Sequence, residues 1–173
     1  KGIVHDPEAR GLLVGMNPQH NRGDLARAIL EGIAFSFREV IEKFESEGFP
    51  VREIRLSGGG AQHPLFNQIK ADVLQRPIIA MDIAQTGCLG AAMSAAAAIG
   101  YYPDLHSAAL AMNRVGEKFS PDSDQADLYT ELFHAFQNIY LGNKIIFSSL
   151  AAWRQKFITA HPSSNINQDS QRR

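Results

Sequence analysis

The stretch "IRLSGGGAQHPLFNQIKADVL", residues 54–74, decides the fold because three consecutive glycines join a strand pattern to a helix pattern. Polar and apolar residues alternate over residues 53–56, which predicts a strand. Pro64 stands where a helix tolerates a missing N–H, so it marks a helix start. Apolar residues at four-residue steps give that helix a buried side, made of Leu65, Ile69 and Val73. The sequence therefore predicts a strand, a glycine turn and a helix in succession.

The sequence around these glycines matches neither of two common phosphate-binding motifs. A P-loop needs Gly, four residues and then Gly-Lys-Ser/Thr, and nothing after Gly60 supplies the lysine and the hydroxyl. The dinucleotide fingerprint Gly-x-Gly-x-x-Gly, counted from Gly58, meets His63 where its third glycine should stand. Two interpretations stay open. Either the glycines let a flat ligand approach the backbone at a crevice, or they form a tight turn that packs against Gly87 and Gly90.

The rest of the chain reads as a succession of short strands and helices. Apolar runs predict further strands at residues 12–14 and 76–82. Periodicity and caps predict helices at residues 25–44, 86–100, 104–112, 125–140 and 146–157, with a loop at 116–124 and a break at 141–143. Gly48 and Pro50 end the first of these helices. This order indicates α/β layers.

Composition limits the class of protein. With 173 residues, 45% hydrophobic and 20% charged, the chain suits one globular domain. A formal net charge of -1 gives no broad basic field for nucleic acid, and no basic amphipathic segment suggests a membrane surface. Cys88 is the sole cysteine, which excludes a disulfide within the chain and a zinc cluster of thiolates. We expect a cytoplasmic protein without a signal peptide or membrane span, whose partners are small molecules or proteins.

Three blocks of sequence resemble a known family. They are "DPEARGLLVGMNPQHNRGDLARAILEGIAFSFREV" at residues 6–40, "SGGGAQHPLFNQIKADVLQRPI" at 57–78 and "TGCLGAAMSAA" at 86–96. Their order and spacing are similar to those of the C-terminal domain of FGGY-family carbohydrate kinases, within the actin, Hsp70 and hexokinase superfamily. Three glycines followed four residues later by Pro64 resemble the xylulokinase-like branch.

The resemblance implies a fold and an activity. The fold class is α/β, a partial ribonuclease-H-like domain with added C-terminal helices; residues 1–158 form the nucleotide-side domain of a sugar kinase and residues 159–173 a disordered tail. The activity is ATP-dependent phosphorylation of a sugar hydroxyl, with D-xylulose as the leading ketose, by a longer parent protein. We therefore expect the chain to begin inside a domain, downstream of two strands, of the sugar pocket and of the catalytic aspartate.

The same resemblance implies where the cofactor lies. The adenine and ribose of ATP would lie against Gly58, Gly59, Gly60, Ala61 and Pro64, and Mg²⁺ would serve the phosphates in the full-length parent. We expect no catalytic residue and no metal ligand in this chain. ATP or ADP would bind here, the sugar would be held mainly by the missing N-terminal part, and a homodimer stays an open option.

Simpler roles are expected for the other residues that stand out. Gln62 and His63 should face water, while His20 and Arg22 should serve as a helix cap and a surface salt bridge rather than contact substrate. The remaining expectations are Gly32 in close packing, Cys88 as a buried thiol, Trp153 in the core, and Asp72, Asp82 and Asp104 as solvated or capping carboxylates. Glu31 matches the family without an assigned role.

Two other classes of function stay open. One is a non-catalytic regulatory or interaction module of the same superfamily, and the other is a scaffold whose glycines only pack. Nucleotide titration separates the kinase interpretation from the scaffold. The gene sequence upstream of Lys1 separates it from the non-catalytic module.

Overall fold

The structure of the chain, a computed structural model, describes residues 6–160. Its helices are α1 (Arg22–Ser46), α2 (Pro64–Leu74), α3 (Thr86–Ala98), α4 (Leu105–Met112) and α5 (Ala126–Ala160). Its strands are β1 (Ile54–Leu56), β2 (Ile78–Met81) and β3 (Val115–Phe119), and short 3-10 turns cover Gly59–Ala61 and Ser123–Gln125. The mixed α/β class expected from the sequence is confirmed.

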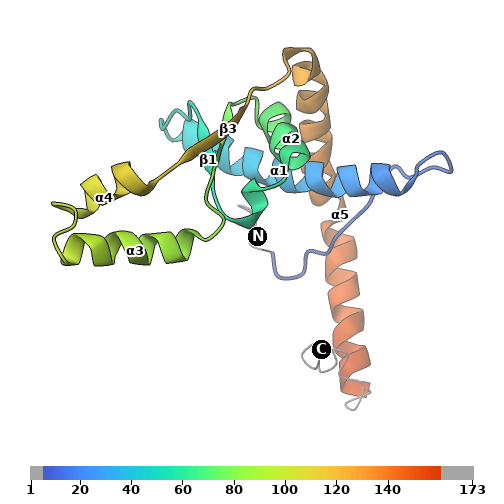
Figure 1. Cartoon of the computed structure of the whole chain (residues 1–173). Coiled ribbons are helices and arrows are strands. Elements are labelled where there is room, and N and C mark those ends of the chain that lie inside the picture. The colour runs from blue at the N-terminus through green and yellow to red at the C-terminus, as the bar shows by residue number, and fades with distance from the viewer. Residues whose placement is uncertain (1–5, 161–173) are drawn as a thin grey trace.

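The three strands form one sheet in the order β1-β2-β3. β1 and β2 are parallel, with Ile54 opposite Ile78, and β3 runs antiparallel to β2, with Phe119 opposite Ile78. Figure 1 shows α1, α2 and α5 crossing beside this sheet, while α3 and α4 extend away from it as an arm. The core lies among these three helices and the sheet, and its largest members include Phe35, Ile69, Ile78, Tyr129 and Phe133.

Local sequence signals fix both ends of α1. The Asn21 N–H donates to Asp24 Oδ2 at 2.8 Å, and the Asn21 side chain accepts from the Gly23 N–H at 2.7 Å, so the helix begins with a capping box. At the other end Gly48 has a φ of 86°, a left-handed conformation that glycine adopts readily. The long helix expected from periodicity is therefore confirmed, and it places Phe35 in the core.

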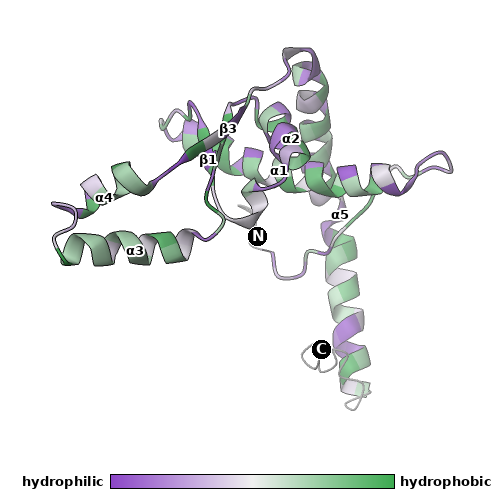
Figure 2. Cartoon of the chain, viewed as in Figure 1, coloured by the Kyte–Doolittle hydropathy of each residue, from purple (hydrophilic) through white to green (hydrophobic). Residues whose placement is uncertain are grey.

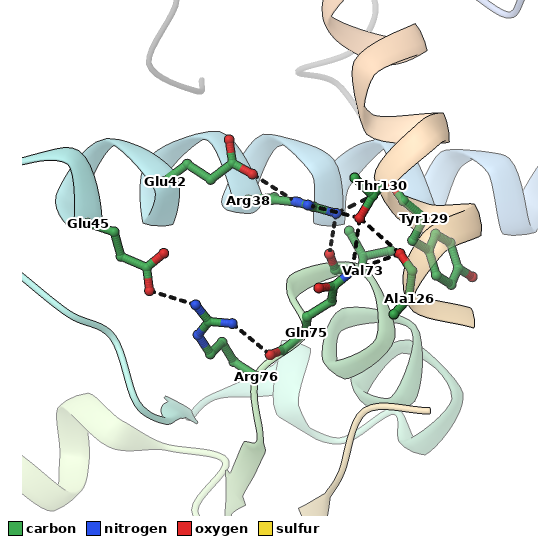
Figure 3. Close-up of polar contacts among 9 residues, drawn as sticks. All are labelled: Arg38, Glu42, Glu45, Val73, Gln75, Arg76, Ala126, Tyr129 and Thr130. Carbon is green, nitrogen blue, oxygen red and sulfur yellow. Dashed lines mark hydrogen bonds and ion pairs between the residues drawn. The ribbon is translucent and has the colours of Figure 1, made fainter. Parts of the chain in front are cut away.

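Polar side chains tie α1 to the end of α2 and the start of α5 (Figure 3). Arg38 of α1 donates to the Val73 carbonyl and to Thr130 Oγ1, both at 3.3 Å. Gln75 ends α2 in a left-handed conformation with a φ of 51° and donates to the Ala126 carbonyl at 2.8 Å. These contacts fix how the three helices cross, and thereby where α2 stands against the sheet.

Residues 12–14 do not form the predicted strand. Their backbone is irregular, and the side chains of Leu13 and Val14 are 53% and 62% accessible. A strand needs a hydrogen-bonded neighbour, and within residues 6–160 the sheet consists of β1, β2 and β3. The apolar run therefore stays exposed in this chain.

The predicted loop at residues 116–124 is wrong in its first part, where β3 forms. Gly116 lets the β3 backbone lie close to β2, because a Cβ at this position would stand 2.6 Å from the Ala80 carbonyl oxygen. Phe119 is the one buried residue of the strand, so buried and exposed side chains do not alternate along it. Pairing with β2 decides this strand, and local pattern does not reveal it.

The predicted break at residues 141–143 is also wrong, because α5 continues through it. A glycine such as Gly142 costs a helix only about 1 kcal/mol. Asn143 donates from its side chain to the Ile139 carbonyl at 2.7 Å, a contact made within the helix. The tail expected at residues 159–173 is wrong for Thr159 and Ala160, which are helical, and residues 161–173 lie outside the described residues.

The second half of α5 projects from the body of the molecule (Figure 1). Trp153, expected in the core, is 63% accessible because it lies on this projecting half. Figure 2 shows that much of the same half is hydrophobic. Near its middle the helix is hydrogen-bonded to the segment before α1, where the Tyr140 hydroxyl donates to Asp6 Oδ2 at 2.8 Å and the Ser148 hydroxyl donates to Glu8 Oε2 at 2.7 Å.

Candidate functional site

The glycine loop, residues 58–61, connects the carboxyl end of β1 to α2. Gly58 has a φ of 78° and a ψ of −169°, a combination that is essentially restricted to glycine. Its N–H donates to the Ile83 carbonyl at 3.1 Å, and its own carbonyl accepts from the Ala61 N–H at 3.0 Å. Gly58 therefore turns the chain sharply out of the sheet, and Pro64 begins α2 a few residues later.

Gly59 and Gly60 present bare backbone to open space. An ideal Cβ placed on either glycine would meet no heavy atom within 4 Å, and the same holds for Gly87 and Gly90 of α3. The interpretation in which these glycines pack against the small-residue helix is therefore wrong within the described residues. Both loop glycines are exposed, so a ligand can reach backbone that no side chain shields.

Two buried polar side chains of α2 hold the glycine loop in place. Asn67 Nδ2 donates to the Ala61 carbonyl at 2.8 Å, and Lys70 Nζ donates to the Gly60 carbonyl at 3.2 Å. Asn67 and Lys70 are only 1% and 3% accessible. Burial lowers the pKa of Lys70, whose ammonium group lies 3.8 Å from the centre of the Phe66 ring. Sequence reasoning missed both residues, although they stand three apart on a helix between buried neighbours.

A cleft of about 320 Å³ opens beside the glycine loop. Ala61, Gln62 and Pro64 line it from the loop and the start of α2. Asp82, which follows β2, and Glu117 of β3 are among the residues that line its other side. Ionised carboxylates accept hydrogen bonds, so these two favour the hydroxyl or amino groups of a ligand over its phosphates. The cleft thus suits a partly apolar ligand with hydrogen-bond donors.

The structure brings Gln62 to this cleft and places His20 in another pocket. Gln62 and His63 are exposed, as expected. The cap of α1 is Asn21 rather than His20 or Arg22, and neither of these two forms a salt bridge within residues 6–160. His20 lines a different pocket, of about 220 Å³, which shares no residue with the cleft beside the glycine loop.

Glu31 and Gly32 take roles that the sequence did not reveal. Glu31 Oε1 accepts from Arg27 Nε at 2.8 Å and from the Tyr129 hydroxyl at 2.9 Å, so it joins α1 to α5. Burial raises the pKa of Tyr129. Gly32 lines a mainly apolar cavity of about 550 Å³ between residues 9–14, α1 and α5. No atom lies within 4 Å of its Cβ position, so the expected close packing is wrong.

Two expectations about burial are wrong. Cys88 is exposed, because α3 lies in the arm rather than against the sheet (Figure 1). Asp72 is 4% accessible, because its carboxylate accepts from Gln68 Nε2 at 2.8 Å and from the Asp122 N–H at 2.9 Å instead of facing water. Asp104 does cap α4, and Asp82 is exposed, as expected.

Along residues 6–160, no three His, Cys, Asp or Glu side chains gather closely enough to hold a metal ion. The helices within this range are too short or too polar to cross a bilayer.

Comparison with known proteins points to one family. Residues 3–99 match the model of the FGGY family of carbohydrate kinases, C-terminal domain. The chain is 35% identical over 150 residues to the xylulose kinase of Bacillus subtilis (strain 168), covering 87% of this chain and 30% of that protein. It is 41% identical over 99 residues to a glycerol kinase of Methylorubrum extorquens (strain PA1), covering 57% of this chain and 20% of that protein. The chain thus spans less than a third of the length of these relatives.

Solved structures give a consistent result. The crystal structure of xylulose kinase from Rhodospirillum rubrum matches with a TM-score of 0.71 at 34% identity, covering 83% of this chain and 29% of that one. Ligand-bound xylulose kinase from Lactobacillus acidophilus matches with a TM-score of 0.72 at 26% identity, covering 84% and 29%. Because the family model covers more than half of the chain, the chain belongs to the FGGY family of carbohydrate kinases and corresponds to its C-terminal domain.

Proposed function

We propose that this chain supplies the adenosine-binding part of an ATP-dependent carbohydrate kinase. The observation that carries the proposal is the glycine loop, in which Gly59 and Gly60 expose bare backbone. Asn67 holds the Ala61 carbonyl and Lys70 holds the Gly60 carbonyl. A rigid loop without side chains is a suitable platform for a flat base. Its position after the carboxyl end of β1 is where α/β sheets commonly bind ligands.

Each residue of the proposed site has a separate task. Gly58 shapes the turn, Gly59 and Gly60 contact the face of adenine, and Ala61 and Pro64 line the adjoining cleft. The carboxylates of that cleft accept hydrogen bonds from ribose hydroxyls or from an amino group. ATP or ADP is the ligand, and ATP, when bound, supplies the phosphoryl group. We assign no catalytic residue and no metal ligand within residues 6–160.

For the complete gene product we propose a ketose as the acceptor, with D-xylulose as the first candidate. Xylulose kinases from several bacteria are among the similar sequences and structures, which supports this choice. A ribulokinase and glycerol kinases are similar too, so the acceptor has to be measured.

Family membership also supports a ribonuclease-H-like fold, a requirement for Mg²⁺ with ATP, and a cytoplasmic location.

Calorimetric titration of ADP into the chain tests the nucleotide site. Gly59→Val should abolish binding, because a branched Cβ would occupy the place of the base. Gly11→Val is the matched control, since a Cβ at Gly11 also meets no atom within 4 Å and lies outside the loop. Thermal unfolding should show both variants folded. Equal ADP affinity in Gly59→Val and the unmodified chain would overturn the proposal.

A coupled assay of ADP release separates the kinase from the non-catalytic module. The complete gene product should turn over with ATP, Mg²⁺ and a ketose, and lose this activity on Gly59→Val. The 173-residue chain alone should release no ADP in a sugar-dependent way, because phosphoryl transfer needs a positioned hydroxyl, a base and groups around the phosphates. A complete gene product that binds ADP but phosphorylates none of a panel of ketoses and polyols would favour the regulatory module.

A further inference from the structure

One side of α5 carries a stripe of exposed apolar side chains along nearly its whole length. The α5 stripe comprises Leu128, Leu132, Ile139, Ile146, Leu150 and Trp153. At 3.6 residues per turn, these residues fall within about one sixth of a turn of each other. All but the half-buried Ile139 are between 41% and 63% accessible. Figure 2 shows the hydrophobic character of the projecting half of this helix.

The α5 stripe is distinct from the face by which α5 joins the core. Tyr129 and Phe133 are 2% and 1% accessible, and their rings lie 6.3 and 5.9 Å from the ring of Phe35 on α1. These core residues are displaced from the stripe by about a quarter turn. The helix therefore has one apolar face that the fold buries and a second that is largely accessible, of which Leu132 and Ile139 also line the cavity between residues 9–14, α1 and α5. An apolar surface of this length on one helix is typical of an interface.

Charge is divided between the two halves of α5. Residues 126–142 contain Asp127 and Glu131 and no lysine or arginine. Residues 143–160 contain Lys144, Arg154 and Lys156 and no aspartate or glutamate. Asp127, Glu131 and Lys156 lie along the same flank of the stripe at 3.6 residues per turn. A helix with this division is electrostatically complementary to an antiparallel copy of itself.

We propose that the α5 stripe binds the α5 stripe of a second copy of this chain in antiparallel orientation. The two copies cross near Gly142, whose lack of a side chain permits close approach of the helices. In this register Leu132 faces Trp153 of the other copy, and Ile139 faces Ile146. Lys156 then lies on the flank that also carries Asp127 and Glu131 of the second copy.

The size of the paired surface is adequate for a dimer. The stripe extends over 26 residues, from Leu128 to Trp153, or about 39 Å of helix at 1.5 Å per residue. Burying the exposed parts of these side chains in both copies removes roughly 1,000 Å² or more from water, near the lower end for specific interfaces. Pairing also packs the projecting half of α5, which as a single helix in water gains little stability. Nothing in this arrangement involves the nucleotide site.

Sedimentation of the full chain tests the interface. The unmodified chain should be a dimer, and the double variant Leu150→Asp/Trp153→Asp should be a monomer. In this variant the amides of α1 and α2 should keep their protection from hydrogen exchange, which shows that the body of the protein is folded. Leu141→Asp is the matched control, because Leu141 is 60% accessible and lies nearly opposite the stripe at 3.6 residues per turn, so this change should leave the dimer intact. A monomeric unmodified chain at the highest soluble concentration would overturn the proposal, as would dissociation by Leu141→Asp alone.

Charge exchange and cross-linking test the orientation. Lys156→Glu should raise the dimer dissociation constant about tenfold, since it repeats a repulsion at both ends of the pair. Adding Asp127→Lys and Glu131→Lys should restore the original dissociation constant.

Cross-linking tests the orientation independently. In a Cys88→Ser background, Gly142→Cys should form a disulfide between copies, whereas Trp153→Cys should not. Efficient cross-linking through Trp153→Cys means a parallel pair and overturns the proposal. So does a monomeric complete gene product in which hydrogen exchange finds the α5 stripe protected, because another segment then covers it.

Discussion

At the scale of single residues, Gly58 determines the shape of the glycine loop, whereas Gly59 leaves its backbone accessible. Gly58 adopts φ and ψ values that only glycine tolerates, whereas Gly59 has ordinary φ and open space around its Cβ position. Gly58→Ala should therefore lower the free energy of unfolding by about 1–3 kcal/mol. Gly59→Ala should leave it unchanged or raise it slightly, because alanine restricts the unfolded chain. Urea denaturation measures both, and equal stability of the two variants would contradict this account of the loop.

Lys70 contributes to the position of the loop more than to stability. Its bond to the Gly60 carbonyl is offset by the cost of burying an ammonium group, the same cost that lowers its pKa. Lys70→Met should thus change the free energy of unfolding by less than about 1 kcal/mol. It should weaken ADP binding several-fold, because the Gly60 carbonyl is released. Denaturation and calorimetry on the same preparation separate the two effects, and undiminished ADP affinity would show that Lys70 does not position the loop.

The sequence reveals loop residues better than it reveals what supports them. Gly58, Gly59 and Gly60 were recognisable as a turn between a strand and a helix, because local pattern specifies such a turn. Whether they also bind adenosine stays a prediction. Lys70 was not recognisable, since the burial of a lysine depends on the loop folding back onto α2. Cys88 was placed wrongly for the converse reason, as a small-residue helix looks buried whether or not anything covers it.

At the scale of elements, β3 depends on a close approach to β2. A Cβ on Gly116 would stand 2.6 Å from the Ala80 carbonyl oxygen and 3.2 Å from the Asp82 N, and both are backbone atoms that cannot move aside cheaply. Gly116→Ala should therefore displace β3 and lower the free energy of unfolding by about 1–3 kcal/mol. Glu117→Ala, one residue later and exposed, should stay within about 0.5 kcal/mol of the unmodified chain.

Hydrogen exchange measures the effect of Gly116→Ala directly. Amides of β2 and β3 should lose protection in this variant while those of α1 keep it. Unchanged protection in β3 would mean that the strand is not held by its contact with β2. The experiment also bears on the proposed site, because Gly116 and Glu117 line the cleft beside the glycine loop.

Helices and strands were predicted correctly where the spacing of apolar residues and the capping or turn residues agreed. Six elements were expected close to their observed bounds: α1, α2, α3, α4, β1 and β2. Each has regularly spaced apolar residues and a capping or turn residue at its end. β3 was missed because only one of its residues is buried, and residues 12–14 were wrongly expected to be a strand because an apolar run does not supply a partner. The break expected in α5 reflects the same limit, as local helix-weakening residues do not outweigh a long helix.

At the scale of the whole molecule, α1 connects the site-bearing part to α5. Glu45 near its end accepts from Arg76 Nη2 at 2.8 Å, and this hydrogen bond lowers the pKa of Glu45 (Figure 3). A carboxylate whose pKa is lower in the folded chain stabilises the fold above its unfolded pKa, and this contribution disappears as pH falls through the folded value. The contact is half-exposed, so its contribution is small. The larger connection is Arg38, which is mostly buried between α1, α2 and α5.

Arg38→Met should loosen the first turns of α5 from the rest of the molecule. The guanidinium group donates to Val73, Tyr129 and Thr130 and lies 4.6 Å from the centre of the Phe133 ring. Methionine keeps much of the volume but leaves the Val73 carbonyl without this partner, so we expect a loss of about 2–4 kcal/mol in the free energy of unfolding. Lys43→Met on the same helix is the control, because the exposed Lys43–Glu47 pair contributes less than about 0.5 kcal/mol. In hydrogen exchange, amides at residues 129–136 should lose protection before those of β2 do. Simultaneous loss in both places would show that α5 and the sheet unfold as one unit, and that Arg38 is no separate link between them.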